Sequence, residues 1–271
     1  MIKDDLEVKL EALKAYIKSL GSLAVGFSGG VDSTFLLAVA REVLGDSVIA
    51  VTCEAEFIPQ RESTEAKAFC RERGIRQFMY KTEVLGTDTF RKNPADRCYH
   101  CKKSIFSNLI KIASENGIKY VAEGSNMDDL GDYRPGIKAV TELKVVSPLR
   151  EAGLYKDEIR ELSKRMGLET WDKPAYACLA SRFVYGEMIT AEKLQMIDRA
   201  EDYLIKLGFV WERVRIHGNI ARIEVPPADI HRITEEETRI KIYRELKKIG
   251  FQFVTLDLGG YKVGSMNSTI Q

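Results

Sequence analysis

The feature that most limits the fold is a series of short, largely apolar runs. They cover residues 23–27, 48–53, 77–81 and 120–123, and a fifth candidate lies at 144–147. Helix-like stretches separate the runs, and strands that alternate with helices imply βαβ units and a parallel sheet. Apolar runs that do not alternate with polar residues are typical of strands covered on both faces. We therefore predict an α/β fold built on a doubly wound parallel sheet.

The second half of the chain has a different pattern. A helix expected over residues 156–166 is followed by an irregular stretch, 171–190, which we predict to be an active-site loop. From residue 191 short elements follow one another: a helix at 191–207, strands at 213–216 and 221–225, a helix at 235–248 and a strand at 253–258. This is an α+β pattern of about 80 residues, a small domain. We therefore predict two domains, 1–185 and 186–271.

Composition and charge exclude several classes of protein. The 41 Lys and Arg residues balance 40 Asp and Glu residues, so the formal charge is +1 and nucleic acid is not expected as a partner. Asp4, Asp5 and Glu7 interrupt the first ten residues, which therefore lack the apolar core of a signal peptide or a membrane span. We expect a cytoplasmic protein with no membrane partner. Five cysteines, an odd number in a reducing compartment, argue against a disulfide framework.

The most specific motif is Ser28-Gly29-Gly30-Val31-Asp32-Ser33, which lies between the first apolar run and a helix expected over 34–43. Two consecutive glycines allow a ligand to approach the backbone closely, and Ser33 is expected to cap a helix whose N-terminus attracts anions. These properties suit a pyrophosphate. The motif lacks the Gly-Lys-Ser/Thr ending of a Walker loop, which disfavours ordinary γ-phosphoryl transfer. The strand–loop–helix setting disfavours the alternative, a glycine-rich turn without function.

The motif resembles the signature of the PP-loop ATP pyrophosphatases, and the resemblance covers roughly residues 20–180. These enzymes split ATP between the α- and β-phosphates and form adenylated intermediates. The resemblance implies that Ser28, Gly29, Gly30 and Ser33 hold the pyrophosphate of ATP. It also implies that Asp32 is a catalytic carboxylate on the side of Mg²⁺.

Three cysteines form a second candidate site. Cys98 and Cys101 are a C-x-x-C pair, a spacing that serves zinc, iron–sulfur clusters or redox disulfides. A structural zinc site needs further ligands, which would come from His100 or from the distant Cys178. Cys178 lies in the irregular stretch close to Arg182, and a nearby cation favours the thiolate. Three cysteines around a 4Fe-4S cluster would leave one iron open to hold a sulfide.

The remaining two cysteines are interpreted as buried hydrophobic residues. Cys53 ends an apolar strand, and Cys70 follows Phe69 on a predicted helix. His100 and His217 are interpreted as structural.

Several segments together resemble the LarE family of ATP-dependent sulfur transferases, which make the nickel-pincer nucleotide cofactor. They are 28–33, 97–102, 123–129, 132–136, 177–182, 214–218 and 221–225. One branch of that family has a single cysteine at the position of Cys178 and sacrifices its sulfur. Because Cys98 and Cys101 are also present, this chain resembles the branch in which three cysteines hold a 4Fe-4S cluster, with Cys178 as a catalytic residue.

The resemblance implies a reaction and its cofactors. The substrate would be pyridinium-3,5-biscarboxylic acid mononucleotide, whose carboxylates become thiocarboxylates after activation by AMP transfer. The cofactors would be ATP, Mg²⁺ and the cluster. A homo-oligomer is expected, and the sulfide donor is not identified. The first domain would be the PP-loop domain, and the second would bind substrate or mediate oligomerisation.

Other candidate ligands follow from their positions. Asp128 and Arg134 follow the strand at 120–123, at the carboxyl edge where α/β sheets bind ligands. Ser181 and Arg182 lie beside Cys178 and are candidate cofactor-binding residues. Arg213 and Arg215 alternate on one strand, so both side chains share a face and would clamp the substrate phosphate. The alternative for this pair is a solvated basic strand face. Glu201 and Asp229 are interpreted as surface carboxylates.

Three other functions remain open. A tRNA thiolation enzyme of the PP-loop class would use a similar cysteine trio but would need a basic RNA-binding face. A PP-loop amide ligase would need no cysteine trio. A redox or zinc-binding module with a nucleotide fold would show no ATP-dependent AMP release.

Overall fold

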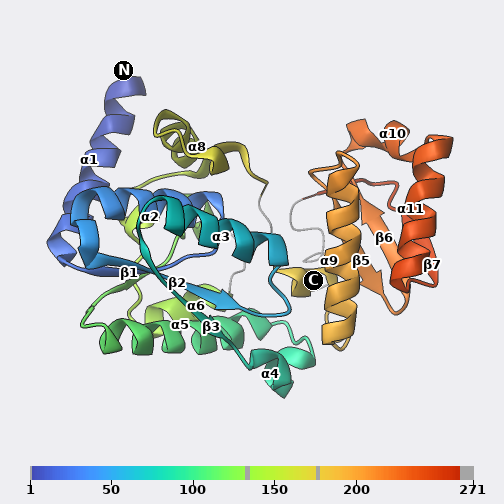
Figure 1. The fold of residues 1–271 in the computed structure, drawn as a ribbon, viewed down its shortest axis with the longest axis horizontal. Coiled ribbons are helices and arrows are strands. Elements are labelled where there is room, and N and C mark those ends of the chain that lie inside the picture. Colours follow the sequence, from blue (N-terminus) through green and yellow to red (C-terminus); the bar gives the residue numbers. More distant parts are fainter. Residues whose placement is uncertain (1, 132–134, 175–177, 263–271) are drawn as a thin grey trace. The chain divides into compact units, whose positions relative to one another are not determined.

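The structure is a computed structural model that describes residues 2–131, 135–174 and 178–262 of the 271-residue chain (Figure 1). Contacts within the chain divide it into two compact units. The first comprises Met1–Ala55, Gln60–Val84 and Asp96–Tyr176. The second comprises Glu56–Pro59, Leu85–Ala95 and Ala177–Gln271. The domain boundary placed after residue 185 stays a prediction.

A four-stranded parallel sheet forms the centre of the first unit. Its strands are β1 (Leu23–Gly26), β2 (Val48–Glu54), β3 (Arg76–Lys81) and β4 (Val121–Ala122). Their order is β3-β2-β1-β4, and every pair is parallel. The chain therefore builds outward from β1 in one direction and returns to pair β4 on the other side of β1. This confirms the predicted doubly wound α/β fold.

Helices cover both faces of this sheet (Figure 1). One face is covered by α1 (Ile2–Leu20), α2 (Val31–Leu44), α3 (Gln60–Glu72), α7 (Pro148–Glu151) and α8 (Lys156–Arg165), and the other by α5 (Arg97–Glu115) and α6 (Pro135–Glu142). Leu23 and Val25 pack into the first core, whereas Ala24 between them packs into the second. This alternation along one strand explains why the strands are apolar at every position.

The fifth predicted strand, at 144–147, is wrong. Val146 makes one isolated parallel bridge to Ala122, and the segment goes no further as a strand. Lys144 has a positive φ of 56°, which breaks the extended conformation, and Pro148 begins α7 two residues after the bridge.

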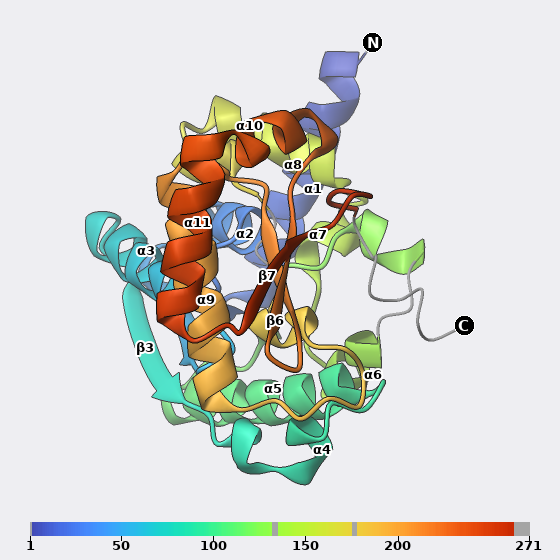
Figure 2. The same ribbon diagram turned by 90° about the vertical axis from the view of Figure 1, so that its right-hand side faces the viewer.

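The second unit has a three-stranded sheet of β5 (Arg213–His217), β6 (Ile220–Glu224) and β7 (Phe253–Leu256), in the order β5-β6-β7. The β5/β6 pair is antiparallel and the β6/β7 pair is parallel. Its helices are α9 (Ala191–Lys206), α10 (Ile230–Thr234) and α11 (Glu236–Ile249), which Figure 2 shows from the side. Helix α9 packs against β5 and α11, and α11 packs against β7. The predicted α+β pattern is thus present.

Two short segments from the first half of the chain belong to the second unit. The main-chain N–H of Leu179 donates to the carbonyl of Phe57 at 2.9 Å. The side chain of Asn93 donates to the carbonyl of Val184 at 2.7 Å, and Gly186 N donates back to Asn93 O at 3.0 Å. Residues 56–59 and 85–95, which include the short helix α4 (Asp88–Arg91), are therefore built into this unit by main-chain bonds.

In the part of the chain that the structure describes, no helix is both long enough and apolar enough to cross a membrane.

Candidate active site

The loop after β1 is held together by its own hydroxyl groups. Gly29 has a positive φ of 76°, a conformation that other residues rarely adopt. The hydroxyl oxygens of Ser28 and Ser33 lie 3.0 Å apart, and the N–H of Ser28 donates to the Ser33 hydroxyl at 3.3 Å. The predicted role of Ser33 as helix cap is wrong, because α2 begins at Val31 with Gly30 as its N-cap. Ser33 lies in the first turn of the helix instead.

The end of β4 lies directly against this loop. A Cβ atom added to Gly124 would lie 3.1 Å from the main-chain nitrogen of Ser33 and 3.3 Å from the Cβ of Asp32. Only a residue without a side chain fits there without displacing the loop. Because the sheet order reverses between β1 and β4, their carboxyl ends form the topological switch point, where open α/β sheets bind ligands.

Both oxygens of the Asp32 carboxylate are engaged within the first unit. Asn126 donates its side-chain N–H to Oδ1 at 3.2 Å, and the ammonium of Lys156 forms an ion pair with Oδ2. The Asp32 side chain is 25% exposed, so solvent and ligands still reach it. Sequence reasoning did not assign a role to either partner. A hydrophilic residue directly after β4 was the available signal for Asn126, but no local pattern distinguishes Lys156.

The loop after β4 is fixed by a set of main-chain hydrogen bonds. Asn126 N donates to Asp129 Oδ2 at 2.9 Å, and Asp128 N donates to Asn126 Oδ1 at 2.9 Å. Asp128 in turn accepts the main-chain N–H of Lys156 at 2.7 Å. The Asp128 carboxylate thus holds the start of α8, and its contact with nucleotide stays a prediction. Arg134 lies outside the described residues.

A second lysine lies at the phosphate loop. Lys173 donates from Nζ to the carbonyl of Gly29 at 3.1 Å and forms an ion pair with Glu65. Its side chain is only 12% exposed. The Walker-type lysine that the motif lacks is therefore replaced in space by cations from distant parts of the chain. Sequence analysis missed Lys173, which has no signal beyond its place in the irregular stretch.

The C-x-x-C pair occupies the first turn of α5, which begins at Arg97. Cys98 is exposed and Cys101 is buried, and residues three apart share a face of a helix. Two thiols on one face near a helix N-terminus suit an anionic pair of metal ligands. The imidazole Nε2 of His100 lies 3.1 Å from Asp96 Oδ2, which agrees with a structural role for this histidine.

The third cysteine of the predicted trio lies in the other unit. Cys178 is exposed, and its carbonyl accepts the N–H of Ser181 at 2.9 Å. Over the described ranges, no group of three His, Cys, Asp or Glu side chains gathers closely enough to hold a metal ion. The trio therefore stays a prediction. Cys53 and Cys70 are buried, as predicted, and burial raises the pKa of the Cys70 thiol to about 12.

Arg182 lies in the interior of the second unit. It is fully buried and donates from Nε and Nη2 to the two carboxylate oxygens of Glu201, at 2.8 and 3.0 Å. A third bond runs from Nη1 to the hydroxyl of Ser181 at 2.8 Å. Burial alone would lower the pKa of Arg182, but Glu201, Glu212 and Cys178 together raise it above its ordinary value.

The interpretation of Glu201 as a surface carboxylate is wrong. The residue has no exposed surface, and its Oε1 also accepts the main-chain N–H of Val214 at 2.9 Å. Burial would raise the pKa of Glu201, but Arg182 outweighs burial and holds it below the usual range. The sequence offered one clue, since position 201 falls on the apolar face of α9 together with Ile197 and Leu204.

Arg213 and Arg215 are also buried, so the alternative of a solvated strand face is wrong. Arg215 donates from Nε and Nη2 to Glu224 at 3.2 and 3.0 Å, and from Nη1 to the carbonyl of Ser181 at 2.9 Å. Burial lowers the pKa of Arg215 despite the opposing effect of Glu224. The guanidinium of Arg213 stacks over the ring of Tyr261, 4.9 Å from its centre. Substrate binding by either arginine stays a prediction.

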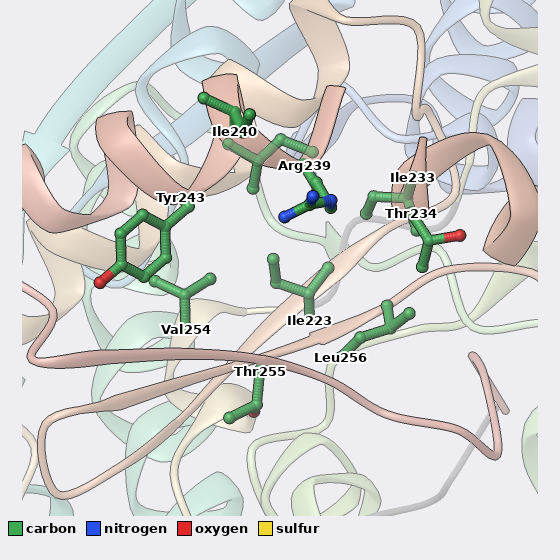
Figure 3. A pocket seen from close by; sticks show the side chains of 10 residues that line it. Ile223, Ile233, Thr234, Arg239, Ile240, Tyr243, Val254, Thr255 and Leu256 are labelled. Carbon is green, nitrogen blue, oxygen red and sulfur yellow. The ribbon is translucent and has the colours of Figure 1, made fainter. Parts of the chain in front are cut away.

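A separate cavity of about 270 Å³ lies in the second unit (Figure 3). Its lining is mainly apolar, with Ile223 and Leu256 on the strands and Tyr243 and Arg239 on α11. The residues predicted for the site are absent from its described lining, and such a surface does not suit a phosphate.

Comparison with known proteins places the chain in a family. The sequence profile of the NAD synthase family matches residues 6–96, which include the phosphate loop. Over 98% of its length the chain is 42% identical to an uncharacterized protein of Synechocystis sp., covering 99% of that protein. It is 40% identical, over 98% of the chain and 96% of the relative, to the pyridinium-3,5-bisthiocarboxylic acid mononucleotide synthase of Lactiplantibacillus plantarum. A glutamine-hydrolyzing GMP synthase polypeptide of Thermoplasma volcanium is 29% identical over 67% of the chain and 63% of the relative. With a phosphate loop at the switch point of its sheet and similarity to a synthase along nearly its whole length, this chain belongs to the LarE family of PP-loop proteins.

Proposed function

We propose that this protein is an ATP-dependent sulfur transferase of nickel-pincer nucleotide biosynthesis. It adenylates a carboxylate of pyridinium-3,5-biscarboxylic acid mononucleotide and converts it to a thiocarboxylate. The observation that carries the proposal is the phosphate loop with Asp32 at the switch point of the sheet, in a chain that resembles a named synthase from end to end.

The first half-reaction uses the residues of the first unit. A carboxylate oxygen of the substrate attacks the α-phosphorus of ATP, the bond from that phosphorus to the bridging oxygen breaks, and pyrophosphate leaves with the electron pair. Gly29 and Gly30 leave the backbone of the loop uncovered, so its N–H groups and the first turn of α2 would receive the pyrophosphate. Mg²⁺ would neutralise charge on the phosphates, and we assign Asp32 to its side because a partly exposed carboxylate is a ligand that Mg²⁺ prefers.

The second half-reaction needs a sulfur nucleophile. A 4Fe-4S cluster held by Cys98, Cys101 and Cys178 would supply a sulfide at the iron that has no protein ligand. Sulfide sulfur replaces oxygen at the activated carbonyl carbon, and AMP leaves with that oxygen. The exposed thiol of Cys98 and its neighbour one turn on would bind one side, and Arg182 would favour the thiolate of Cys178.

The substrate contacts in this proposal come from both units. We assign the substrate phosphate to Arg213 and Arg215, with Ser181 and Arg182 supporting them. Two guanidinium groups on one strand face are suited to a phosphate, and Glu224 would orient Arg215 through its paired hydrogen bonds. Asp128 and Arg134 remain candidate contacts to the nucleotide.

The proposal also covers the setting of the enzyme. We propose a homo-oligomer in the cytoplasm, where thiols stay reduced, with a PP-loop domain over 1–185 and a substrate-binding or oligomerisation domain over 186–271. None of the five cysteines, all within the described residues, forms a disulfide, which is compatible with that location.

The test is a reaction with oxygen-free protein, the mononucleotide, MgATP and sulfide. We expect AMP, pyrophosphate and a product in which one oxygen is exchanged for sulfur, detected by mass spectrometry. The Asp32→Asn variant should lose AMP formation but keep its iron. The variants Cys98→Ala, Cys101→Ala and Cys178→Ala should lose iron and acid-labile sulfide and keep adenylation.

Three outcomes would contradict parts of this proposal. AMP release that requires tRNA, with tRNA retained on a filter, would identify the thiolation enzyme. Full product formation by Cys98→Ala with ammonia in place of sulfide would identify an amide ligase. Stoichiometric zinc without AMP release would identify a binding module.

A further inference from the structure

Lys156 reaches the phosphate loop from a distant part of the chain. It is the first residue of α8, and its ammonium forms an ion pair with Oδ2 of Asp32, which lies 124 positions earlier in the sequence. The side chains are 27% and 25% exposed, so the pair is open to a ligand on one side and supported by protein on the other.

The backbone around Lys156 is fixed from two directions. Its own main-chain N–H donates to Asp128 Oδ2 at 2.7 Å, and the N–H of Tyr155 donates to Glu158 Oε2 at 2.8 Å. Asp128 belongs to the loop whose Asn126 also bonds Asp32. The start of α8 and the phosphate loop are therefore tied to the same short segment after β4. A lysine anchored in this way is held at the site by the fold, not by a chance surface contact.

Charge explains why a cation is needed there. A loop that receives pyrophosphate places several negative charges close to the Asp32 carboxylate, and like charges repel strongly at a partly buried site. The motif itself supplies no lysine. The other lysine at the loop, Lys173, is already bonded to the carbonyl of Gly29 and paired with Glu65. Lys156, by contrast, rests on the carboxylate that the metal would use.

We propose that Lys156 is a further catalytic residue of the adenylation step, an inference that rests on the proposed function. When MgATP binds, Mg²⁺ takes the place of the ammonium on Asp32, and the ammonium moves to the phosphate oxygens. As the bond between the α-phosphorus and the bridging oxygen breaks, pyrophosphate leaves with the electron pair. Lys156 donates hydrogen bonds to it and keeps its own proton.

This exchange has two consequences of opposite direction. Lys156 and Mg²⁺ compete for one carboxylate, so removing the ammonium should make the metal bind more tightly. The same change removes a charge-assisted donor from the leaving group, so it should slow adenylation. A residue that only held α8 in place would weaken both properties together.

The experiment compares Lys156→Gln with Lys9→Gln in the full-length protein. Lys9 is a matched control because its ammonium binds Glu158 of the same helix at 2.7 Å. Two quantities are measured: the Mg²⁺ concentration that half-saturates ATP binding, by calorimetry, and the rate of pyrophosphate release with the mononucleotide. For Lys156→Gln we expect a several-fold lower Mg²⁺ requirement and a release rate lower by about 10²–10³-fold, the effect of losing one preorganised donor. Lys9→Gln should match the wild type in both.

Lys156→Arg keeps the positive charge and guards against misfolding of the glutamine variant. It should restore the wild-type Mg²⁺ requirement and part of the rate. A release rate for Lys156→Gln within twofold of wild type, or a raised Mg²⁺ requirement, would overturn the inference. If the wild type releases no pyrophosphate with the mononucleotide, the proposed function fails, while the Mg²⁺ titration still decides the competition between Lys156 and the metal.

Discussion

Replacing Glu201 by glutamine would remove one negative charge from the interior of the second unit with little change in size. Glu201 has no exposed surface and accepts two bonds from Arg182 and one from the main chain of Val214. Breaking a buried ion pair on one side costs about 3–5 kcal/mol, because the remaining charge is left without its partner in a poorly solvated place. Glu212 also attracts Arg182, so we expect a loss near about 3 kcal/mol.

The assay is urea denaturation followed by circular dichroism and tryptophan fluorescence. The matched control is Asp202→Asn on the same helix, which breaks the exposed pair between Asp202 and Lys206. That pair has side chains 41% and 71% exposed, so the control should lose less than about 1 kcal/mol. If Glu201→Gln unfolds at the same urea concentration as Asp202→Asn, the interior ion pair does not stabilise this unit and the reasoning is refuted.

Acid provides a second measurement on the same pair. The folded state holds the pKa of Glu201 below its ordinary value, so the stabilising contribution is complete above the unfolded pKa of about 4.3. It is lost as the pH falls through the lower, folded value. The difference in stability between wild type and Glu201→Gln should therefore be constant from about pH 7 to pH 5 and shrink below about pH 4. A difference that persists unchanged at about pH 3 would contradict the assigned cause.

The remaining predictions concern the first unit. Gly124→Ala should weaken ATP binding by about tenfold in calorimetry, because the new methyl group displaces the phosphate loop, whereas Gly86→Ala, with open space around it, should not. Native protein treated with iodoacetamide at pH 8 should be alkylated at exposed Cys98 and spared at buried Cys70, whose thiol stays protonated, as read by peptide mass spectrometry. Tyr80→Phe removes a 3.1 Å hydrogen bond to the main chain of α5 and should lower the free energy of unfolding by about 1 kcal/mol in urea titrations.

Local pattern was sufficient for the sheet of the first unit and for its phosphate loop. Strands β1 to β4 appear where uninterrupted apolar runs predicted them, because each is covered on both faces. The start of α2 was misplaced, since a glycine served as N-cap where a serine was expected. The run at 144–147 failed as a strand because the positive φ of Lys144 is not visible in a hydrophobicity pattern.

Pairs between distant residues were beyond local reasoning. Nothing around Lys156 or Lys173 indicates that their ammonium groups meet the phosphate loop, because each contact depends on the completed fold. Glu201 was misjudged for a related reason. A carboxylate is normally assigned to the surface unless a buried cation is known to face it, and Arg182 lies 19 positions away.

The segments 56–59 and 85–95 have a consequence for how this protein can be divided. A fragment that starts at Ala177 would leave the N–H of Leu179 and the carbonyl of Val184 without the partners that Phe57 and Asn93 provide. During synthesis these two loops leave the ribosome well before the residues that they bond, so the second unit finishes only when the last third of the chain has emerged. Anyone transplanting that unit onto another PP-loop scaffold would have to graft three pieces of sequence and not one.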